Sequence, residues 1–322
     1  QYVRGVAPKA KIIPVKVLNT YEGLEGDVFG TDLMVAAGIN YIADLAESEG
    51  IKIVISMSIG GPEPGPVIRD AIAHAIDNGV IVVAAAGNSG EPMGWPADPE
   101  TWFLDWPGAY PEVICVGSCG WGMGVITKGK KDTRGDPKYL GTGEWEPWPQ
   151  IPRTWWYEDV AEDMEDEISY ISYFSSREYV NPAFPKEDVE LDVVAPGSWV
   201  LGPYPGDTFG YQHIPWWAQG SPWNPNTPPP NYWYVGGTSM ATPHVSGVAA
   251  LMLQEDPTLT QADVEGILKD TATPLPTAIL GYPFAYNWVR WPSGAVYPFQ
   301  WAADATGAGI IQADAAITAI PP

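Results

Sequence analysis

Apolar residues follow two different periods along this chain. Short apolar runs typical of buried strands occupy 11–18, 53–58, 80–85, 113–117 and 191–194. Segments with the apolar spacing of helices occur at 31–48, 67–78 and 260–269, and another begins near Ser239. Because strands and helices alternate, we expect an α/β fold in which a mostly parallel sheet lies between layers of helices.

Two of these helices have recognisable end signals. Gly79 closes the helix predicted at 67–78. Thr260, followed three residues later by Asp263, approximates a capping box at the start of the helix predicted at 260–269. The end signals therefore support both helix predictions.

The composition excludes several classes of protein. Of the 322 residues, 45% are hydrophobic and 12% are aromatic, so the chain can bury a large core and is not disordered. A net charge of −23 argues against nucleic acids and anionic membrane surfaces as partners. No apolar run reaches the roughly 20 residues of a membrane-spanning helix.

The chain contains two cysteines, Cys115 and Cys119, which lie four residues apart. Two cysteines are too few for a disulfide framework or a zinc site. We interpret Cys115 as a buried strand thiol and Cys119 as a loop thiol, in preference to a local disulfide.

Three stretches rich in Trp and Pro lie at about 120–171, 204–234 and 275–304. They contain most of the 16 Trp residues and many of the 34 Pro residues. We interpret them as ordered surface insertions packed by aromatic side chains, because flexible linkers have a different composition. We therefore expect residues 1–322 to form one domain with three insertions.

The clearest chemical signal is the segment 236–244, with the sequence GGTSMATPH. Its glycines free the turn, and Ser239 falls where a helix N-terminus presents unpaired N–H groups and the positive end of its dipole. Pro243 is tolerated because first-turn N–H groups have no helical partner. A Ser or Thr cap on an ordinary core helix would explain Ser239 alone. The length of the motif favours a serine nucleophile.

Residues 237–253 closely resemble the nucleophile motif of the subtilisin-like serine proteases, the subtilases. Other segments resemble further parts of this family and follow in the family's order: 53–61, 82–88, 110–117, 173–176, 191–197 and 307–313. The resemblance implies a three-layer subtilisin-like fold. It also implies a serine endopeptidase that hydrolyses peptide bonds through an acyl-enzyme.

The same resemblance assigns roles to single residues. Ser239 would be the nucleophile, and Asn88 with the Ser239 N–H would form the oxyanion hole. The alternative for Asn88 is a turn residue after a glycine. The Thr238 hydroxyl would be a further donor behind the site. The substrate main chain would pair with the segment Ser58, Ile59 and Gly60 as an added strand, and Ala86 and Gly87 would also bind substrate.

Asp105 is a local departure that bears on specificity. The segment 106–111 resembles the stretch that follows the floor of the family's primary specificity pocket, which places Asp105 near that floor. A carboxylate there would favour Lys or Arg at the cleavage position. The alternative is a solvated loop carboxylate.

Asp192 resembles part of a weak cation site of the family, together with main-chain carbonyls near Gly108, Tyr110 and Val113. Oxygen ligands suit calcium or sodium. The tighter calcium loop of the family would lie mostly before residue 1. The resemblance thus implies structural calcium and no cofactor for catalysis.

The resemblance leaves the catalytic Asp and His to be supplied from elsewhere, because segment 1–8 resembles the stretch just after the family's His helix. Of the chain's 3 histidines, His74 lies on a predicted helix and His213 lies in a Trp- and Pro-rich loop. His244 follows Ser239 by five residues, so on a helix it points away from the nucleophile. An α/β-hydrolase is excluded, because its His would follow the Ser at long range.

In the family, the Asp-bearing strand lies between the strands that 11–18 and 53–58 resemble. This chain alone would therefore leave two strand edges unpaired. We expect an N-terminal fragment of the same precursor as partner, with peptide substrates, a propeptide inhibitor and an extracellular location. The alternative is a catalytically inactive scaffold or binding subunit, against which the intact Ser239, Thr238 and Asn88 argue.

Overall fold

The computed structural model describes residues 5–20, 28–90, 103–122, 168–178, 189–198, 200–203, 232–277, 285–290 and 296–321. In this part of the chain the helices are α1 (Asp32–Glu49), α2 (Pro66–Asp77), α3 (Thr238–Glu255), α4 (Gln261–Thr271), the short η6 (Ala303–Ala305) and α5 (Ala313–Thr318). The strands are β1 (Asn19–Thr20), β2 (Val28–Phe29), β3 (Val54–Met57), β4 (Ile81–Ala85), β5 (Ile114–Gly122), β6 (Ile168–Ile171), β7 (Val193–Pro196), β8 (Val200–Pro203), β9 (Tyr232–Val235), β10 (Ala285–Arg290) and β11 (Val296–Trp301). His213 and most of the three predicted insertions lie outside the described residues.

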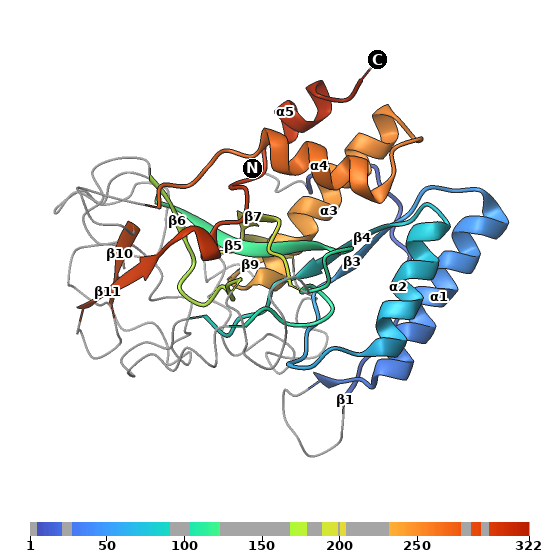
Figure 1. Ribbon diagram of the computed structural model, residues 1–322, viewed down its shortest axis with the longest axis horizontal. Helices are drawn as coiled ribbons and strands as arrows, with labels where there is room; N and C mark the ends of the chain where they lie inside the picture. Colours follow the sequence, from blue (N-terminus) through green and yellow to red (C-terminus); the bar gives the residue numbers. More distant parts are fainter. Residues whose placement is uncertain are drawn as a thin grey trace.

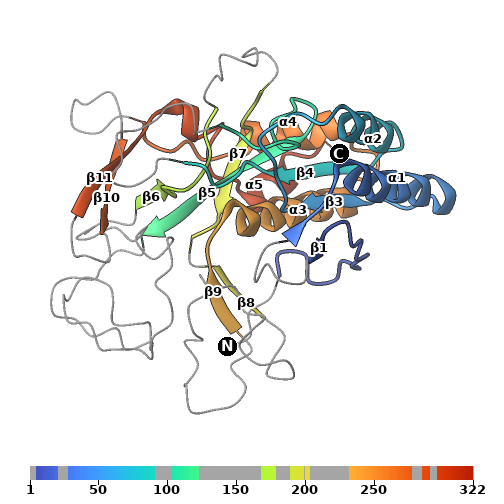
Figure 2. The ribbon, with the colours of Figure 1, turned by 90° about the horizontal axis from the view of Figure 1, so that it is seen from below.

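The central sheet is mostly parallel, as the alternation of strands and helices predicts. β3 pairs with β4, β4 with β5, and β5 with β7, all in parallel register. β6 adds an antiparallel strand at the far end of β5. Helices α1 and α2 cover one face of the sheet and α3 covers the other (Figures 1 and 2). The fold is thus the expected three-layer α/β arrangement.

Strand β4 joins the two halves of the core. Val82 and Ala84 are buried against α1 and α2, and Ile81 and Val83 are buried against α3. Neighbouring residues of a strand point to opposite faces, so a strand covered on both faces is apolar throughout. This explains why β4 appears in the sequence as a continuous apolar run.

The helix ends carry the caps that the sequence predicts. Gly79, just after α2, has φ +75°, a conformation that glycine adopts without strain. At α4, the Thr260 N–H and hydroxyl both donate to the Asp263 carboxylate, at 2.9 and 2.6 Å, and the Asp263 N–H donates to the Thr260 hydroxyl at 3.2 Å. The capping box at Thr260 is therefore confirmed.

Two sequence predictions are wrong in their local structure. Residues 11–18 form no strand: they run as irregular chain, and Ile12 keeps 86% of its surface exposed. Apolar residues do not make a strand unless a neighbouring backbone completes the ladder. Cys119 is not in a loop, because β5 continues to Gly122 and buries it beside β6 and β7. Both cysteines are free thiols, as expected.

Strand β3 is the edge of the central sheet among the described strands. Its ladder partner on one side is β4, whose five residues are all buried. Ser56, in the middle of β3, is exposed, and Val54 and Ile55 are only half-buried. Three apolar side chains of segment 11–18, Ile12, Ile13 and Val15, are also exposed. An edge of this kind presents unpaired backbone groups that can accept another strand.

Candidate active site at the amino end of helix α3

Ser239 lies in the first turn of α3, directly after β9 and a two-glycine turn. Gly237 caps the helix with φ +148°, so the turn requires a residue without a side chain. Thr238 and Ser239 are the first two helical residues, and Ser239 is half-buried. The N–H groups of a first helical turn have no acceptor within the helix. The turn therefore presents the Ser239 hydroxyl together with backbone donors.

Asn88 follows β4 at the carboxyl end of the strand and is bound to the same turn. Its Oδ1 accepts a hydrogen bond from the Thr238 N–H at 2.9 Å and another from the Thr238 hydroxyl at 3.0 Å. Two donors on one carbonyl oxygen fix the orientation of the amide. The NH₂ group of exposed Asn88 is then available to an acceptor outside the chain.

Ser58 connects the end of β3 to the same helix turn. Its hydroxyl donates a hydrogen bond to the Ser239 carbonyl at 2.7 Å. Three residues later, Gly61 and Trp106 exchange backbone hydrogen bonds of 2.9 and 2.8 Å as an antiparallel bridge. The segment containing Ser58, Ile59 and Gly60 is thus extended beside Ser239, and Ile59 packs partly into the core.

The Asp105 side chain lies between two glycines. Gly60 precedes the Gly61–Trp106 bridge, and Gly87 precedes Asn88. A Cβ atom built on Gly60 would come within 2.7 Å of Asp105 Oδ2, and one built on Gly87 within 2.5 Å. The Asp105 N–H donates to the Ala86 carbonyl at 2.8 Å, which holds the residue against this strand end. Only glycine at both positions leaves room for the carboxylate. The structure therefore brings Asp105 together with Gly60, Ala86 and Gly87.

Burial is the cause of an unusual pKa at Asp105. Loss of solvation raises the pKa of the Asp105 carboxyl from 3.8 to about 6. A solvated loop carboxylate would keep its ordinary pKa. The burial of Asp105 thus argues against a fully solvated loop carboxylate, and its place in the specificity pocket stays a prediction.

No described histidine can act on Ser239. His74 Nδ1 lies 2.9 Å from Asn40 Oδ1 on the neighbouring helix α1, as expected for a satisfied helix residue. His244 Nδ1 lies 2.8 Å from the Met240 carbonyl of its own helix. Within the described part of the chain, the Ser239 hydroxyl is thus without a basic partner.

Asp192 lies away from this turn, buried at the start of β7 with 1% of its surface exposed. One carboxylate oxygen accepts from the Cys115 N–H at 2.7 Å and the other from the Lys269 ammonium at 3.0 Å. Burial is the main cause that raises the pKa of Asp192 to about 7, with Glu265 adding to it. A calcium ion at the usual 2.3–2.6 Å from this carboxylate would also contact the ammonium. As arranged, the residues do not fit the expected cation, and the site stays a prediction.

Sequence reasoning missed two features. Ser176, in the segment 173–176, is buried and accepts a hydrogen bond from the Ser89 N–H at 3.0 Å, next to Gly87. The motif alone does not indicate this contact. Lys269 and Glu265 are one helical turn apart on α4, a spacing that favours an ion pair. That spacing is visible in the sequence, but their contact with Asp192 is not.

Comparison with known proteins identifies the family of this chain. The Subtilase family model, Peptidase_S8, matches residues 1–288. The chain is 28% identical over 250 residues to "Major intracellular serine protease" of Bacillus subtilis, covering 78% of this chain and 49% of that protein. It is 28% identical over 273 residues to "Subtilisin DY" of Bacillus licheniformis, covering 85% of this chain and 65% of that protein. The chain thus spans about half to two thirds of these relatives.

A solved structure supports the fold assignment. Fervidolysin from Fervidobacterium pennivorans, described as a keratinolytic enzyme related to subtilisin, is 25% identical, with a TM-score of 0.58. The similarity covers 100% of this chain and 34% of fervidolysin. Among the described residues, none of the helices is both long and apolar enough to cross a membrane.

Proposed function

The chain belongs to the subtilase family of serine peptidases, and we propose that it is the Ser239-bearing part of a serine endopeptidase. Ser239 forms the acyl-enzyme, and a His oriented by an Asp, both on an upstream segment or a separate fragment, removes its proton. The observation that carries the proposal is the pair of hydrogen bonds from Thr238 to Asn88 Oδ1. These bonds hold an amide donor at the same helix turn as the nucleophile.

The reaction follows from what each group can do. The substrate main chain pairs with the extended segment at Ser58–Gly60, as an added strand does. The Ser239 hydroxyl attacks the carbonyl carbon, and its proton passes to the external His. Negative charge then develops on the carbonyl oxygen, where the Asn88 NH₂ group and the Ser239 N–H stabilise it. The C–N bond then breaks as the His passes the proton to the leaving amine, and the acyl group stays on Ser239. Water next attacks the acyl carbon and gives its proton to the His. The Ser239–acyl bond breaks, the carboxylic acid leaves, and the His returns the proton to Ser239.

The open edge of β3 supports an upstream partner. Among the described strands, β3 pairs with β4 on one side only, so its other side could accept a further strand. Such a strand extends the parallel sheet and brings the acid and the base to the carboxyl ends of β3 and β4. The partner is therefore a segment of the same precursor, with its register set by β3.

The carboxylate of Asp105 supports a preference for basic substrates. It lies beside Gly60 and Gly87, which belong to the two segments that contact the peptide. A Lys or Arg side chain in this pocket gives the poorly solvated carboxylate an opposite charge. Replacing Asp105→Ser should lower kcat/KM for cleavage after Lys or Arg relative to Phe or Leu. An unchanged preference across a peptide library would contradict the assignment.

Three further parts of the proposal rest on family resemblance. They are an extracellular location, a propeptide that inhibits the enzyme, and structural calcium at a site other than Asp192. Activity recovered mainly from the culture medium of the source cells would support the first.

The proposed function is tested with the complete protein, including its upstream segment. It should cleave internal bonds of a synthetic peptide library, and Ser239→Ala should not. Denaturing mass spectrometry should find the Asp and His in the same polypeptide or in a smaller fragment that co-purifies under native conditions. Folded protein that has this segment but cleaves no peptide would favour the inactive scaffold.

A further inference from the structure

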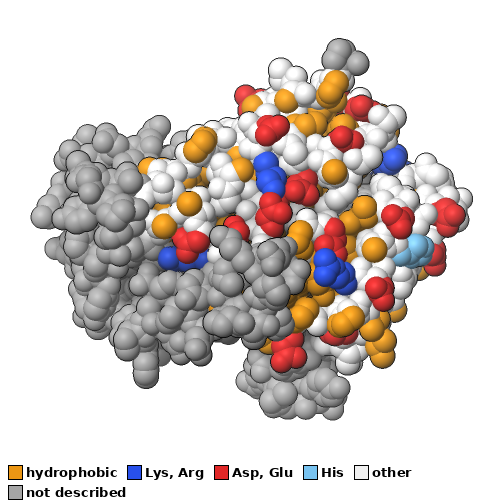
Figure 3. Space-filling view, in the orientation of Figure 1, with side chains coloured by type: hydrophobic (Ala, Val, Ile, Leu, Met, Phe, Trp, Pro, Cys, Tyr) orange, Lys and Arg blue, Asp and Glu red, His pale blue; other side chains and the backbone are white. Residues whose placement is uncertain are grey.

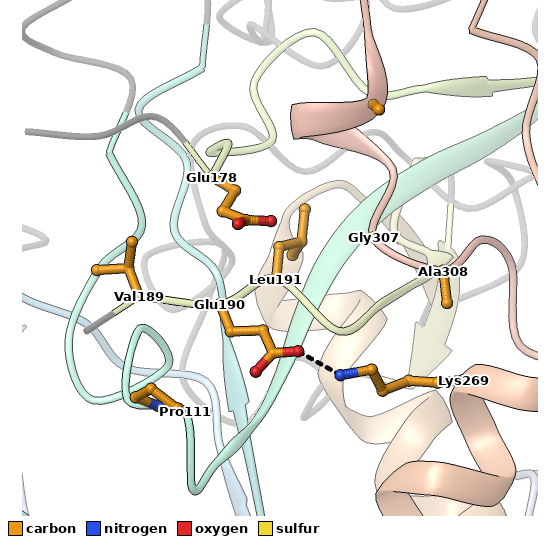
Figure 4. A pocket seen from close by; sticks show the side chains of 9 residues that line it. Pro111, Glu178, Val189, Glu190, Leu191, Lys269, Gly307 and Ala308 are labelled. Carbon is orange, nitrogen blue, oxygen red and sulfur yellow. Dashed lines mark hydrogen bonds and ion pairs between the residues drawn. The ribbon is translucent and has the colours of Figure 1, made fainter. Parts of the chain in front are cut away.

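Lys269 is surrounded by acidic side chains. Its ammonium donates to Glu190, to Asp192 Oδ1 at 3.0 Å and to Glu265 at 3.3 Å. Oxygens of these three carboxylates lie within 4.8 Å of one another. Figure 4 shows Lys269 reaching from α4 toward Glu190, with Glu178 above Glu190 in the lining of the same pocket. One ammonium thus contacts all three members of the cluster.

The cluster joins elements that are far apart in the sequence. Lys269 and Glu265 belong to α4, whereas Glu190 and Asp192 precede β7. Asp192 also accepts the Cys115 N–H of β5, at 2.7 Å. The ammonium therefore lies where α4 meets the β5–β7 edge of the sheet.

The charges in the cluster require a cation at this place. Three carboxylates repel one another when nothing positive lies between them, and Asp192 is almost fully buried. A divalent metal ion or an ammonium group can each provide the positive charge. The three carboxylate contacts of Lys269 are those that a bound calcium ion would need, since calcium binds carboxylate oxygens at 2.3–2.6 Å.

We propose that the ammonium of Lys269 is the resident cation of the cluster of Glu190, Asp192 and Glu265, in place of a bound metal ion. The junction of α4 with β7 is then held by the chain itself and does not respond to chelators. This inference rests on the fold and the side-chain contacts, and it holds whether or not the chain is a peptidase.

A pocket gives solvent ions access to this cluster. It has a volume of about 490 Å³ and is lined by Glu178, Glu190, Lys269 and main chain near Gly307. On the face of the molecule seen in Figure 3, acidic side chains are spread widely and basic ones are few. A hydrated calcium ion can therefore reach the carboxylates, and the lysine is what keeps it out.

The first experiment counts calcium ions on the complete protein in a Ser239→Ala background, which prevents self-cleavage. Equilibrium dialysis with radiolabelled calcium should give the same count for the parent and for Glu190→Gln. Glu255→Gln, an exposed change on α3, is the matched control. Loss of one calcium ion in Glu190→Gln, with the control unchanged, would overturn the proposal, because the cluster would then hold the metal.

The second experiment removes the internal cation. Lys269→Met should bind one more calcium ion than the parent, and its Tm should rise by several degrees when calcium replaces EDTA. Lys269→Arg keeps the charge and should match the parent in both measurements. A folded Lys269→Met that binds no extra calcium would overturn the proposal. If Lys269→Met does not fold, the Glu190→Gln count decides.

Discussion

Replacing Asp105→Asn should change how the stability of the folded protein depends on pH. Burial raises the pKa of Asp105 from 3.8 to about 6 in the folded chain. Below pH 3.8 both the folded and the unfolded states hold the proton. As the pH rises toward 6 the unfolded chain releases it first, so the stability that neutral Asp105 contributes is lost over this range.

The size of the effect follows from the two pKa values. One pH unit of difference corresponds to ~1.4 kcal/mol, and partial access of solvent to the half-buried side chain reduces the total to ~2 kcal/mol. Asn has nearly the same shape, so it fits between Gly60 and Gly87 without a titrating proton. The free energy of unfolding of Asp105→Asn, relative to the parent, should therefore increase by ~2 kcal/mol between pH 4 and 7.

Urea unfolding followed by circular dichroism, at fixed ionic strength and in the Ser239→Ala background, measures this difference. Asp256→Asn is a control of opposite sign, because hydrogen bonds from Thr258 lower the pKa of Asp256. The stability from Asp256 is present at neutral pH and is lost as the pH falls through its lowered pKa. If the stability curves of Asp105→Asn and the parent ran parallel from pH 4 to 7, Asp105 would be a solvated carboxylate and the pocket argument would fail.

Three further substitutions test the geometry around the helix turn. Asn88→Ala should lower kcat about 10²–10³-fold with little change in KM, because the amide stabilises charge present only in the transition state. This range was measured in subtilisin itself. Steady-state kinetics that show a loss confined to KM would argue for a structural role of Asn88. Thr238→Val removes one of the two hydrogen-bond donors to Asn88 and should lower kcat roughly tenfold. Thr238→Ser keeps the hydroxyl donor and should keep the parent kcat. Equal kcat for the two variants would contradict the role of the Thr238 hydroxyl. Gly87→Ala places a Cβ at φ +101° and 2.5 Å from Asp105, so thermal unfolding should show a loss of at least ~1–3 kcal/mol; an unchanged Tm would mean that the strand end can move.

The parallel core of the fold could be predicted from the sequence because its signals are local. Apolar runs and capping residues indicate each element without reference to distant parts of the chain. Residues 11–18 show the limit of this reasoning. Their apolar pattern is that of a strand, but a strand exists only where a second backbone completes the ladder. Cys119 was misplaced for a related reason, because β5 is extended by its pairing with β6 and β7.

The candidate site was predictable as a set of residues but not as a geometry. Motifs identified Ser239 and Asn88, yet the hydrogen bonds from Thr238 to Asn88 join residues 150 positions apart. The contact of Lys269 with Asp192 spans 77 positions. The sequence indicates which oxygens are available at Asp192, and only the fold shows that an ammonium already occupies them.

The central claim is that Ser239 is an activated nucleophile. The most direct measurement is reaction of the complete protein with a fluorophosphonate, followed by digestion and mass spectrometry of the peptides. The account predicts a single adduct on Ser239, formed by the native protein and absent in Ser239→Ala and after denaturation. Adducts on another residue, or no adduct on folded protein that contains its upstream Asp and His, would contradict it.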